Sequence, residues 1–240
     1  PTPDTGRLGL STVDEEGNAE QFRYHPQERL TEYVNPSGVT TRYHYDEEMR
    51  TTRIVHGDGS EERYEYGAAG NLLSFTDERG YTWRYEYDAD GNRTAEIDPE
   101  ARRTSYRYDA DDRLTARTEP SGRTTRYRYD DAGNLIAIIH PDGAVERTSY
   151  TRRGRLHLSV DVSGAVTRYR YDAHGYLAAV TYPDGAVHRF AHDALGRRTT
   201  FIDAAGIRTE QSYRADGLPE ARRVIPAPES GGGTPDAPAR

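Results

Sequence analysis

The fold is decided by the stretch TTRYRYDDAGNLIAIIHPDGA at residues 124–144. It combines a Tyr-x-Tyr-Asp segment, a glycine shortly after it and a Pro-x-Gly segment near its end, and it recurs along the chain with a period of 21 residues. Tyrosine occupies one position of the repeat at Tyr24, Tyr45, Tyr66, Tyr87, Tyr108, Tyr129, Tyr150, Tyr171 and Tyr213. An aromatic residue stands two positions earlier, and the tyrosines of this second series are Tyr43, Tyr64, Tyr85, Tyr106, Tyr127 and Tyr169. Tandem repetition of so short a unit indicates a repeat array, in which each unit packs only against its neighbours.

The spacing of the two aromatic series indicates a β-strand. Side chains two residues apart point to the same face of a strand, whereas on a helix they diverge. Arginines such as Arg63, Arg126 and Arg168 directly precede the aromatic pairs, so they point to the opposite face. We therefore expect the first strand of each repeat to have one aromatic face and one charged face.

Two kinds of turn are predicted in each repeat. The first has Asp in first place and Gly in fourth, the preference of a type I turn followed by a left-handed residue. Its glycines are Gly70, Gly91, Gly133, Gly175 and Gly196. The second has Pro in second place, where the fixed φ of proline fits a turn, and Gly in fourth place. Its glycines include Gly122, Gly143 and Gly185.

The segment between the two turns is predicted to be the return strand of a hairpin. It begins with leucine in several repeats, and the residue four positions later is Thr, Ile or Val, as in Leu135 and Ile139. Strict period-two alternation places Leu135, Ala137 and Ile139 on one face. We expect this face to interleave with the ladder of tyrosines.

Composition limits the class of function. All 32 basic residues are arginine, 40 acidic residues outnumber them, and the net charge is -8. Because phosphate binding needs clustered positive charge, we expect no nucleic-acid partner. The longest apolar run, Leu135 to Ile139, is too short to span a membrane. The chain has no cysteine for thiolate chemistry, and no motif suggests a cofactor.

These features predict an all-β chain, built as a long antiparallel sheet of tandem 21-residue hairpins. We expect residues 1–225 to hold about ten units, and residues 226–240, rich in Pro, Gly and Ser, to be a flexible linker or tail. About twenty strands at ~4.8 Å each give an open sheet of roughly 100 Å. Because twisted sheets of this length curl, we expect a spiral or the curled segment of a cocoon wall. The hydrophobic fraction of 34% suits a thin sheet better than a two-layer core.

The segments Tyr85–Asn92 and Tyr127–Leu135 resemble the Tyr-x-Tyr-Asp-x-x-Gly-Asn/Arg-Leu pattern of the YD repeats of RHS proteins. The resemblance runs from about Asp4 to Val224, and Pro-x-Gly segments such as Pro141-Asp142-Gly143 complete it. The family includes bacterial polymorphic toxins, the C components of Tc insecticidal toxin complexes and the animal teneurins. The sequence lacks the tyrosine-rich core motif and the autoproteolytic aspartate site that usually end the bacterial shells. We therefore expect an internal segment of a shell.

The resemblance implies a fold and a set of partners. RHS shells are spiralling β-sheets that close into a hollow cocoon, and in bacterial members the cocoon holds a toxic C-terminal polypeptide. The resemblance thus implies a structural shell segment of a secreted or exported bacterial effector. Its partners would be the rest of the parent RHS shell and the enclosed C-terminal toxin. The alternative is a module that binds carbohydrate or a cell surface, because exposed aromatic rows suit sugar faces. A third possibility is self-association through unpaired strand edges.

No pattern predicts an active site, and we expect the chain not to be an enzyme. Paired carboxylates such as Glu61-Glu62 and Asp130-Asp131 occur in several repeats. Acid–base catalysis needs one site whose groups have pKa values tuned apart, so turn and solvent roles are favoured.

Metal sites are not predicted either. Among the eight histidines only His56 and His140 share a repeat position. Asp88, Asp90 and Asn92 resemble the start of a calcium loop, but Arg93 and Pro99 stand where that loop requires Gly and Glu. Capping of a turn is the expected role of Asp88. The predicted site residues are therefore structural, namely the two tyrosine series and the turn glycines.

Overall fold

The computed structural model describes residues 8–15, 17, 19–25 and 29–227. The expected all-β class is confirmed, because these residues form 21 strands and no helix. The strands are β1 (Leu8–Val13), β2 (Ala19–Tyr24), β3 (Leu30–Val34), β4 (Thr40–Tyr45), β5 (Thr51–Val55), β6 (Glu61–Tyr66), β7 (Leu72–Thr76), β8 (Thr82–Tyr87), β9 (Arg93–Ile97), β10 (Arg103–Tyr108), β11 (Leu114–Thr118), β12 (Thr124–Tyr129), β13 (Leu135–Ile139), β14 (Val145–Tyr150), β15 (Leu156–Val160), β16 (Val166–Tyr171), β17 (Leu177–Thr181), β18 (Val187–His192), β19 (Arg198–Ile202), β20 (Arg208–Tyr213) and β21 (Pro219–Ile225). Most of the tail predicted at 226–240 lies outside the described residues. The structure, where it is described, has no helix long and apolar enough to cross a membrane.

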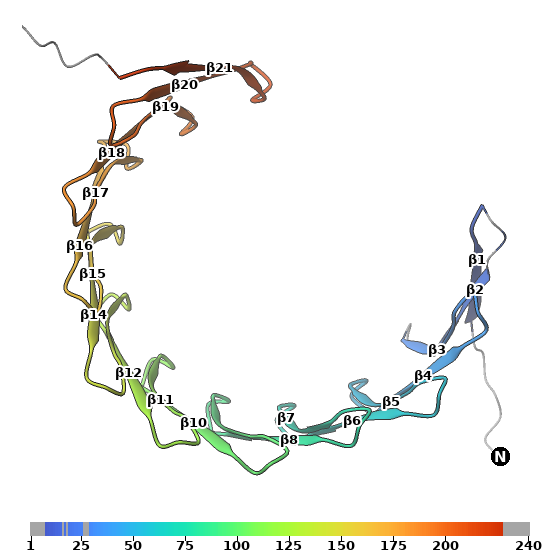
Figure 1. Cartoon of the computed structure of the whole chain (residues 1–240). Coiled ribbons are helices and arrows are strands. Elements are labelled where there is room, and N and C mark those ends of the chain that lie inside the picture. The colour runs from blue at the N-terminus through green and yellow to red at the C-terminus, as the bar shows by residue number, and fades with distance from the viewer. Residues whose placement is uncertain (1–7, 16, 18, 26–28, 228–240) are drawn as a thin grey trace, which may run out of the picture. The chain divides into compact units, whose positions relative to one another are not determined.

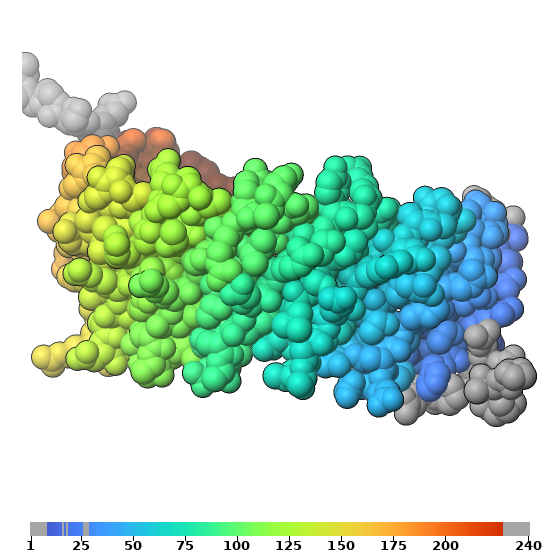
Figure 2. Space-filling view, turned by 90° about the horizontal axis from the view of Figure 1, so that it is seen from below, coloured from blue at the N-terminus to red at the C-terminus, as the bar shows by residue number. Residues whose placement is uncertain are grey.

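The chain divides into two compact units, Pro1–Thr125 and Arg126–Arg240. In the first unit β1 to β11 pair antiparallel in chain order. In the second unit β12 to β21 do the same. Within each unit the strip of strands bends instead of lying flat (Figure 1). In the space-filling view, successive hairpins form bands that lie side by side (Figure 2). The predicted tandem hairpins are thus confirmed.

Every hairpin turn that the structure describes in full places a left-handed residue in fourth position. In the turn after β8, the amide of Gly91 donates to the carbonyl of Asp88, and Gly91 has a φ of 92°. This backbone region costs an L-residue roughly 1–2 kcal/mol, which explains why glycine is preferred here. Three turns have another residue at this position, namely Met49, Ala101 and Asp112, with φ of 62°, 62° and 59°.

A β-bulge in the hairpins changes the face expected for part of the return strand. In β12 and β13, Tyr129 pairs with Leu135, but Tyr127 pairs with Ile138, so the register shifts by one residue between the two pairs. Leu135 therefore joins the tyrosines as expected, whereas Ile139 lies on the charged face. The prediction that Leu135 and Ile139 share a face was wrong, because the extra residue of a bulge inverts the alternation.

The sheet is one layer thick and has almost no buried core. Where the structure is described, each strand packs only against the strands before and after it. Ala95 and Val180 are the buried apolar residues of this part, at 0% and 6% exposure, and Ser74 is buried at 9%. The modest hydrophobic fraction of the sequence is enough for such a layer.

Candidate functional site

The predicted repeat residues form a continuous pattern on the strands and turns. Each predicted tyrosine lies on the first strand of its repeat, and each predicted glycine lies in a turn with positive φ. In β16, Tyr169 and Tyr171 are half-buried, whereas Arg168 and Arg170 are exposed. The first strands thus have one aromatic and one charged face, as the residue spacing predicts.

Aromatic side chains from neighbouring strands stack across the aromatic face. The ring of Tyr64 lies 5.1 Å from that of Phe75, and Phe75 lies 5.6 Å from Trp83 of the next strand. In the second unit, Phe190 and Phe201 stack at 5.4 Å. Such pairs stabilise neighbouring strands beyond the area that they bury.

In several repeats, one tyrosine series connects the repeat to the preceding one through its hydroxyl group. The Tyr171 hydroxyl donates to the carbonyl oxygen of Leu156 at 2.8 Å. The ladder between β15 and β16 ends at Leu158, so this bond extends the contact between repeats beyond the ladder. The same bond joins Tyr45 to Leu30, Tyr87 to Leu72, Tyr108 to Arg93, Tyr150 to Leu135 and Tyr213 to Arg198. We call it the tyrosine latch.

Removal of one latch is expected to loosen one repeat junction. Tyr171→Phe should destabilise β15 and β16 by about 1 kcal/mol, because it deletes one hydrogen bond and leaves the ring in place. Tyr169→Phe is the matched control, since Tyr169 lies on the same strand and face and its hydroxyl makes no hydrogen bond within the described structure. Amide hydrogen exchange of both strands measures the effect. Equal exchange rates in the two variants would contradict a stabilising latch.

The aspartate of the first turn organises the backbone around it. In the turn after β18, Asp193 Oδ1 accepts the amides of Leu195 and Arg197, both at 3.0 Å. Its Oδ2 accepts Nε of Arg197 at 2.7 Å. The Arg197 guanidinium also lies 4.7 Å from the ring centre of Tyr213 in the next repeat. This turn is therefore capped locally and linked to the next repeat.

Turn aspartates make the array sensitive to acid. Hydrogen bonds from the Ser163 hydroxyl and the Ala165 amide lower the pKa of Asp161 below its ordinary value of 3.8. The amide and the hydroxyl of Ser60 lower the pKa of Asp58 in the same way. Because the folded pKa is depressed, the stabilisation is present above pH 3.8 and is lost as the pH falls through the folded pKa.

We therefore expect a melting temperature that is constant above about pH 5 and falls below about pH 4. Circular dichroism melts across this range provide the measurement. Asp161→Asn keeps a capping oxygen that does not titrate, so it should reduce the fall in melting temperature at acid pH. An acid response identical in the unmodified chain and this variant would contradict the contribution of Asp161.

The carboxylates considered as acid–base or calcium groups have turn and ion-pair roles. Asp88 Oδ1 accepts the amides of Asp90 and Asn92 at 3.1 and 2.8 Å, as expected of a capping residue. Glu61 pairs with Arg63 on the charged face at 3.0 Å. Its neighbour Glu62 points to the aromatic face, so the sheet separates the two adjacent carboxylates.

The structure brings together three residues that the sequence hypothesis did not connect, namely His56, Glu62 and Glu78. Their ligand atoms lie within 4.8 Å of one another. Glu78 lies 22 residues after His56, one repeat and one residue further on. Comparing positions one period apart would have shown this neighbourhood, because adjacent hairpins align equivalent positions.

Two solved structures of Tc toxin proteins match this chain at low sequence identity. The crystal structure of TcdB2-TccC3 is 14% identical, with 88% of this chain and 17% of that chain covered and a TM-score of 0.41. The Photorhabdus luminescens Tc holotoxin pore is also 14% identical, with 86% and 16% covered and a TM-score of 0.40. This chain thus spans about a sixth of the length of either structure. No curated protein matches it.

The RHS Repeat family matches the chain in tandem. The matched residues are 24–61, 66–103, 108–145 and 150–187, and each match covers two return strands together with the first strand between them. Together they include more than half of the 240 residues. The chain therefore belongs to the RHS repeat family.

Proposed function

We propose that this chain is a structural wall segment of a larger RHS-repeat shell, and that the shell encloses a toxin polypeptide. The observation that carries this proposal is a sheet of a single layer with both faces open, in which the first and the last described strands each have one unpaired edge. Such a sheet suits a wall better than a core-forming domain, because its stability comes from neighbouring repeats.

The end strands support continuation of the wall. In the described part of the chain, β1 pairs on one side with β2 and β21 pairs on one side with β20. Leu10 and Val13 of β1 are 60% and 64% exposed. An open edge with exposed apolar side chains is a template for a further strand. The partner that fits both edges is more of the same repeat array.

The chemistry of the surface supports a passive role, and we propose that the chain has no catalytic activity. Many of its carboxylates cap turns or pair with arginines, as Asp193 and Glu61 do. A toxic activity would then belong to the enclosed polypeptide, and the complete protein would be an exported bacterial effector.

The carbohydrate-binding alternative is less well supported by the tyrosine ladder. Latch hydroxyls such as those of Tyr45 and Tyr171 already donate to backbone carbonyls, so they do not offer that hydrogen to a sugar. We expect a glycan array probed with this chain to give no signal above background. A reproducible signal that Tyr171→Phe leaves intact but Tyr169→Phe abolishes would favour sugar binding.

Limited proteolysis of the complete shell protein tests the proposal. We expect its C-terminal region to resist protease within the shell and to be digested rapidly when the same region is expressed alone. Destabilising this segment by Gly122→Ala should increase cleavage of the C-terminal region in the shell. Equal digestion rates for the enclosed and the free region would contradict enclosure.

A further inference from the structure

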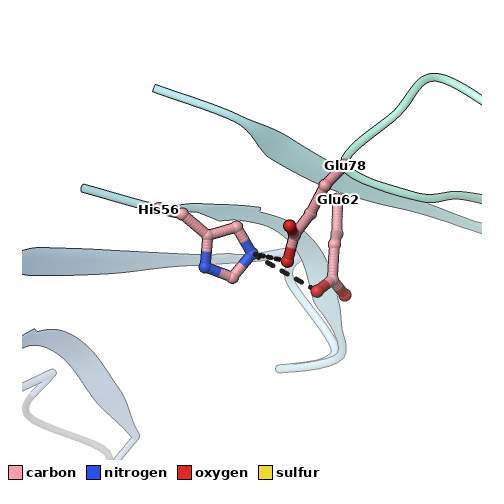
Figure 3. A group of neighbouring side chains, drawn as sticks. All are labelled: His56, Glu62 and Glu78. Atoms are coloured by element: carbon pink, nitrogen blue, oxygen red, sulfur yellow. Dashed lines mark hydrogen bonds and ion pairs between the residues drawn. The ribbon is translucent and has the colours of Figure 1, made fainter. Parts of the chain in front are cut away.

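His56, Glu62 and Glu78 converge within the first unit (Figure 3). His56 begins the turn after β5, Glu62 is the second residue of β6, and Glu78 belongs to the turn after β7. His56 Nε2 lies 3.3 Å from Oε1 of Glu62 and 3.1 Å from Oε1 of Glu78. The side chains of His56 and Glu62 are 28% and 21% exposed, whereas Glu78 is 51% exposed. Solvent therefore reaches the group from the side of Glu78.

The spacing of these three atoms is that of ligands around one metal ion. A single imidazole nitrogen faces two carboxylate oxygens, and it has at most one hydrogen to donate. A cation would satisfy all three groups and offset the repulsion of the two carboxylates. Two ligand atoms that share a tetrahedral zinc ion, each about 2.0–2.1 Å from it, lie roughly 3.3 Å apart. The two distances from His56 Nε2, 3.3 and 3.1 Å, match that separation.

A second hydrogen bond fixes the orientation of Glu62. The hydroxyl of Tyr64 donates to Oε2 of Glu62, which leaves Oε1 directed at His56. Hydrogen bonds to the outer atoms of ligand side chains are a regular feature of metal sites.

The repeat contains an incomplete copy of this group. Four repeats later, His140 and Glu146 occupy the equivalent positions, with Nε2 and Oε1 2.8 Å apart. The position equivalent to Glu78 is Val162, which is 56% exposed. The position equivalent to Tyr64 is Thr148, whose hydroxyl donates to the carbonyl of Leu135 instead. This copy lacks both the third ligand and the orienting hydroxyl.

We propose that His56, Glu62 and Glu78 form a binding site for a divalent cation of the Zn²⁺ class, with water completing its coordination. One imidazole nitrogen and two carboxylate oxygens form a mixed ligand set that suits Zn²⁺ better than Ca²⁺ or Mg²⁺, which favour oxygen ligands alone. Because Glu78 comes from the repeat after that of His56, the ion would connect two neighbouring turns. The site goes beyond the proposed wall function and does not depend on it.

Isothermal titration of the full chain with zinc chloride near pH 7 tests the site. We expect one tight Zn²⁺ per chain with a dissociation constant of about 1 μM or lower. Glu78→Val, which reproduces Val162 at an exposed turn position, should weaken binding about tenfold or more, and Tyr64→Phe should weaken it about tenfold. His140→Ala is the control, and it should leave this affinity unchanged.

A gain-of-function variant tests whether the geometry is sufficient. Thr148→Tyr combined with Val162→Glu gives the second group all four side chains, and we expect the number of tight Zn²⁺ ions to rise from one to two. Circular dichroism spectra confirm that each variant keeps its strands. The site is contradicted if the unmodified chain shows no saturable binding, if Glu78→Val binds as tightly as the unmodified chain, or if the rebuilt group gains no ion.

Discussion

Ala95→Leu is expected to destabilise strands β8 to β10 by about 1–3 kcal/mol. Ala95 is 0% exposed although it lies on the charged face of a single-layer sheet. Its cross-strand partners are Glu86 of β8 and Ser105 of β10. The Arg103 guanidinium donates to both carboxylate oxygens of Glu86 at 2.6 and 2.7 Å, so this ion pair spans β9 over the alanine. A leucine would occupy the space beneath the bridge.

The expected loss comes from overpacking rather than from the ion pair itself. Arg103 and Glu86 are 47% and 49% exposed, and ion pairs in solvent contribute little to stability. Ala95 is nevertheless fully buried where this pair crosses β9, and a larger side chain must displace the pair or shift the backbone. Amide hydrogen exchange of β9 measures the change locally, as suits a repeat array in which unfolding need not be global.

Ala137→Leu is the matched control, because Ala137 occupies the same repeat position. Its cross-strand partners are Arg128 and Arg147, which carry like charges and cannot bridge each other. Leu158 already occupies this position one repeat later, so the sheet has room for leucine where no bridge crosses. We expect Ala137→Leu to change the free energy of unfolding by less than about 0.5 kcal/mol. Equal losses in the two variants would show that the bridge over Ala95 is not the cause.

The second large effect is expected at the left-handed turn position. Gly122→Ala should lower stability by about 1–2 kcal/mol, because Gly122 has a φ of 83° that an L-residue adopts at a cost. A methyl group there would meet no atom within 4 Å, so the cost is backbone strain alone. Ala101 occupies the same position in the preceding repeat with a φ of 62°.

The reverse exchange at Ala101 provides the internal control. Ala101→Gly removes the backbone strain but increases the conformational freedom of the unfolded chain. We therefore expect a gain in stability of up to about 1 kcal/mol, smaller than the loss in Gly122→Ala. Hydrogen exchange of the amides flanking each turn follows both variants. Opposite signs at the two sites support the strain argument, whereas a loss of stability in both variants would contradict it.

Local patterns were enough to predict the strands and turns of this chain. The two-residue spacing of Tyr127 and Tyr129 fixes the face of the first strand, and glycines such as Gly133 mark the left-handed turn positions. Strict alternation along the return strand predicted the wrong face for Ile139. The β-bulge adds one residue between the paired positions, and the composition of the segment does not show that the bulge is there.

The sequence patterns could not predict the side-chain contacts between repeats. The bond from Tyr171 to Leu156 and the meeting of His56 with Glu78 both depend on how one hairpin lies against the next. The 21-residue period indicates which residues are neighbours, but not whether their side chains reach one another. Those distances depend on the twist and bulges of the sheet.

A wall built from such junctions has no central core, so its stability is a sum of local contributions. Tyrosine latches, turn aspartates and cross-strand aromatic pairs recur with the period of the repeat. Each junction depends on its neighbours on both sides, and among the described strands β1 and β21 each lack one neighbour. In the proposed shell, these two end strands pair with strands of further repeats.

Amide hydrogen exchange of β1 and β21 tests this claim most directly, with the isolated chain compared with the complete shell protein. In the isolated chain we expect these two strands to exchange fastest, because each has one open edge. In the complete protein we expect both to be protected as strongly as inner strands such as β8 and β9. Exchange of β1 and β21 that is equally fast in both proteins would contradict the account of this chain as an internal segment of a continuous wall.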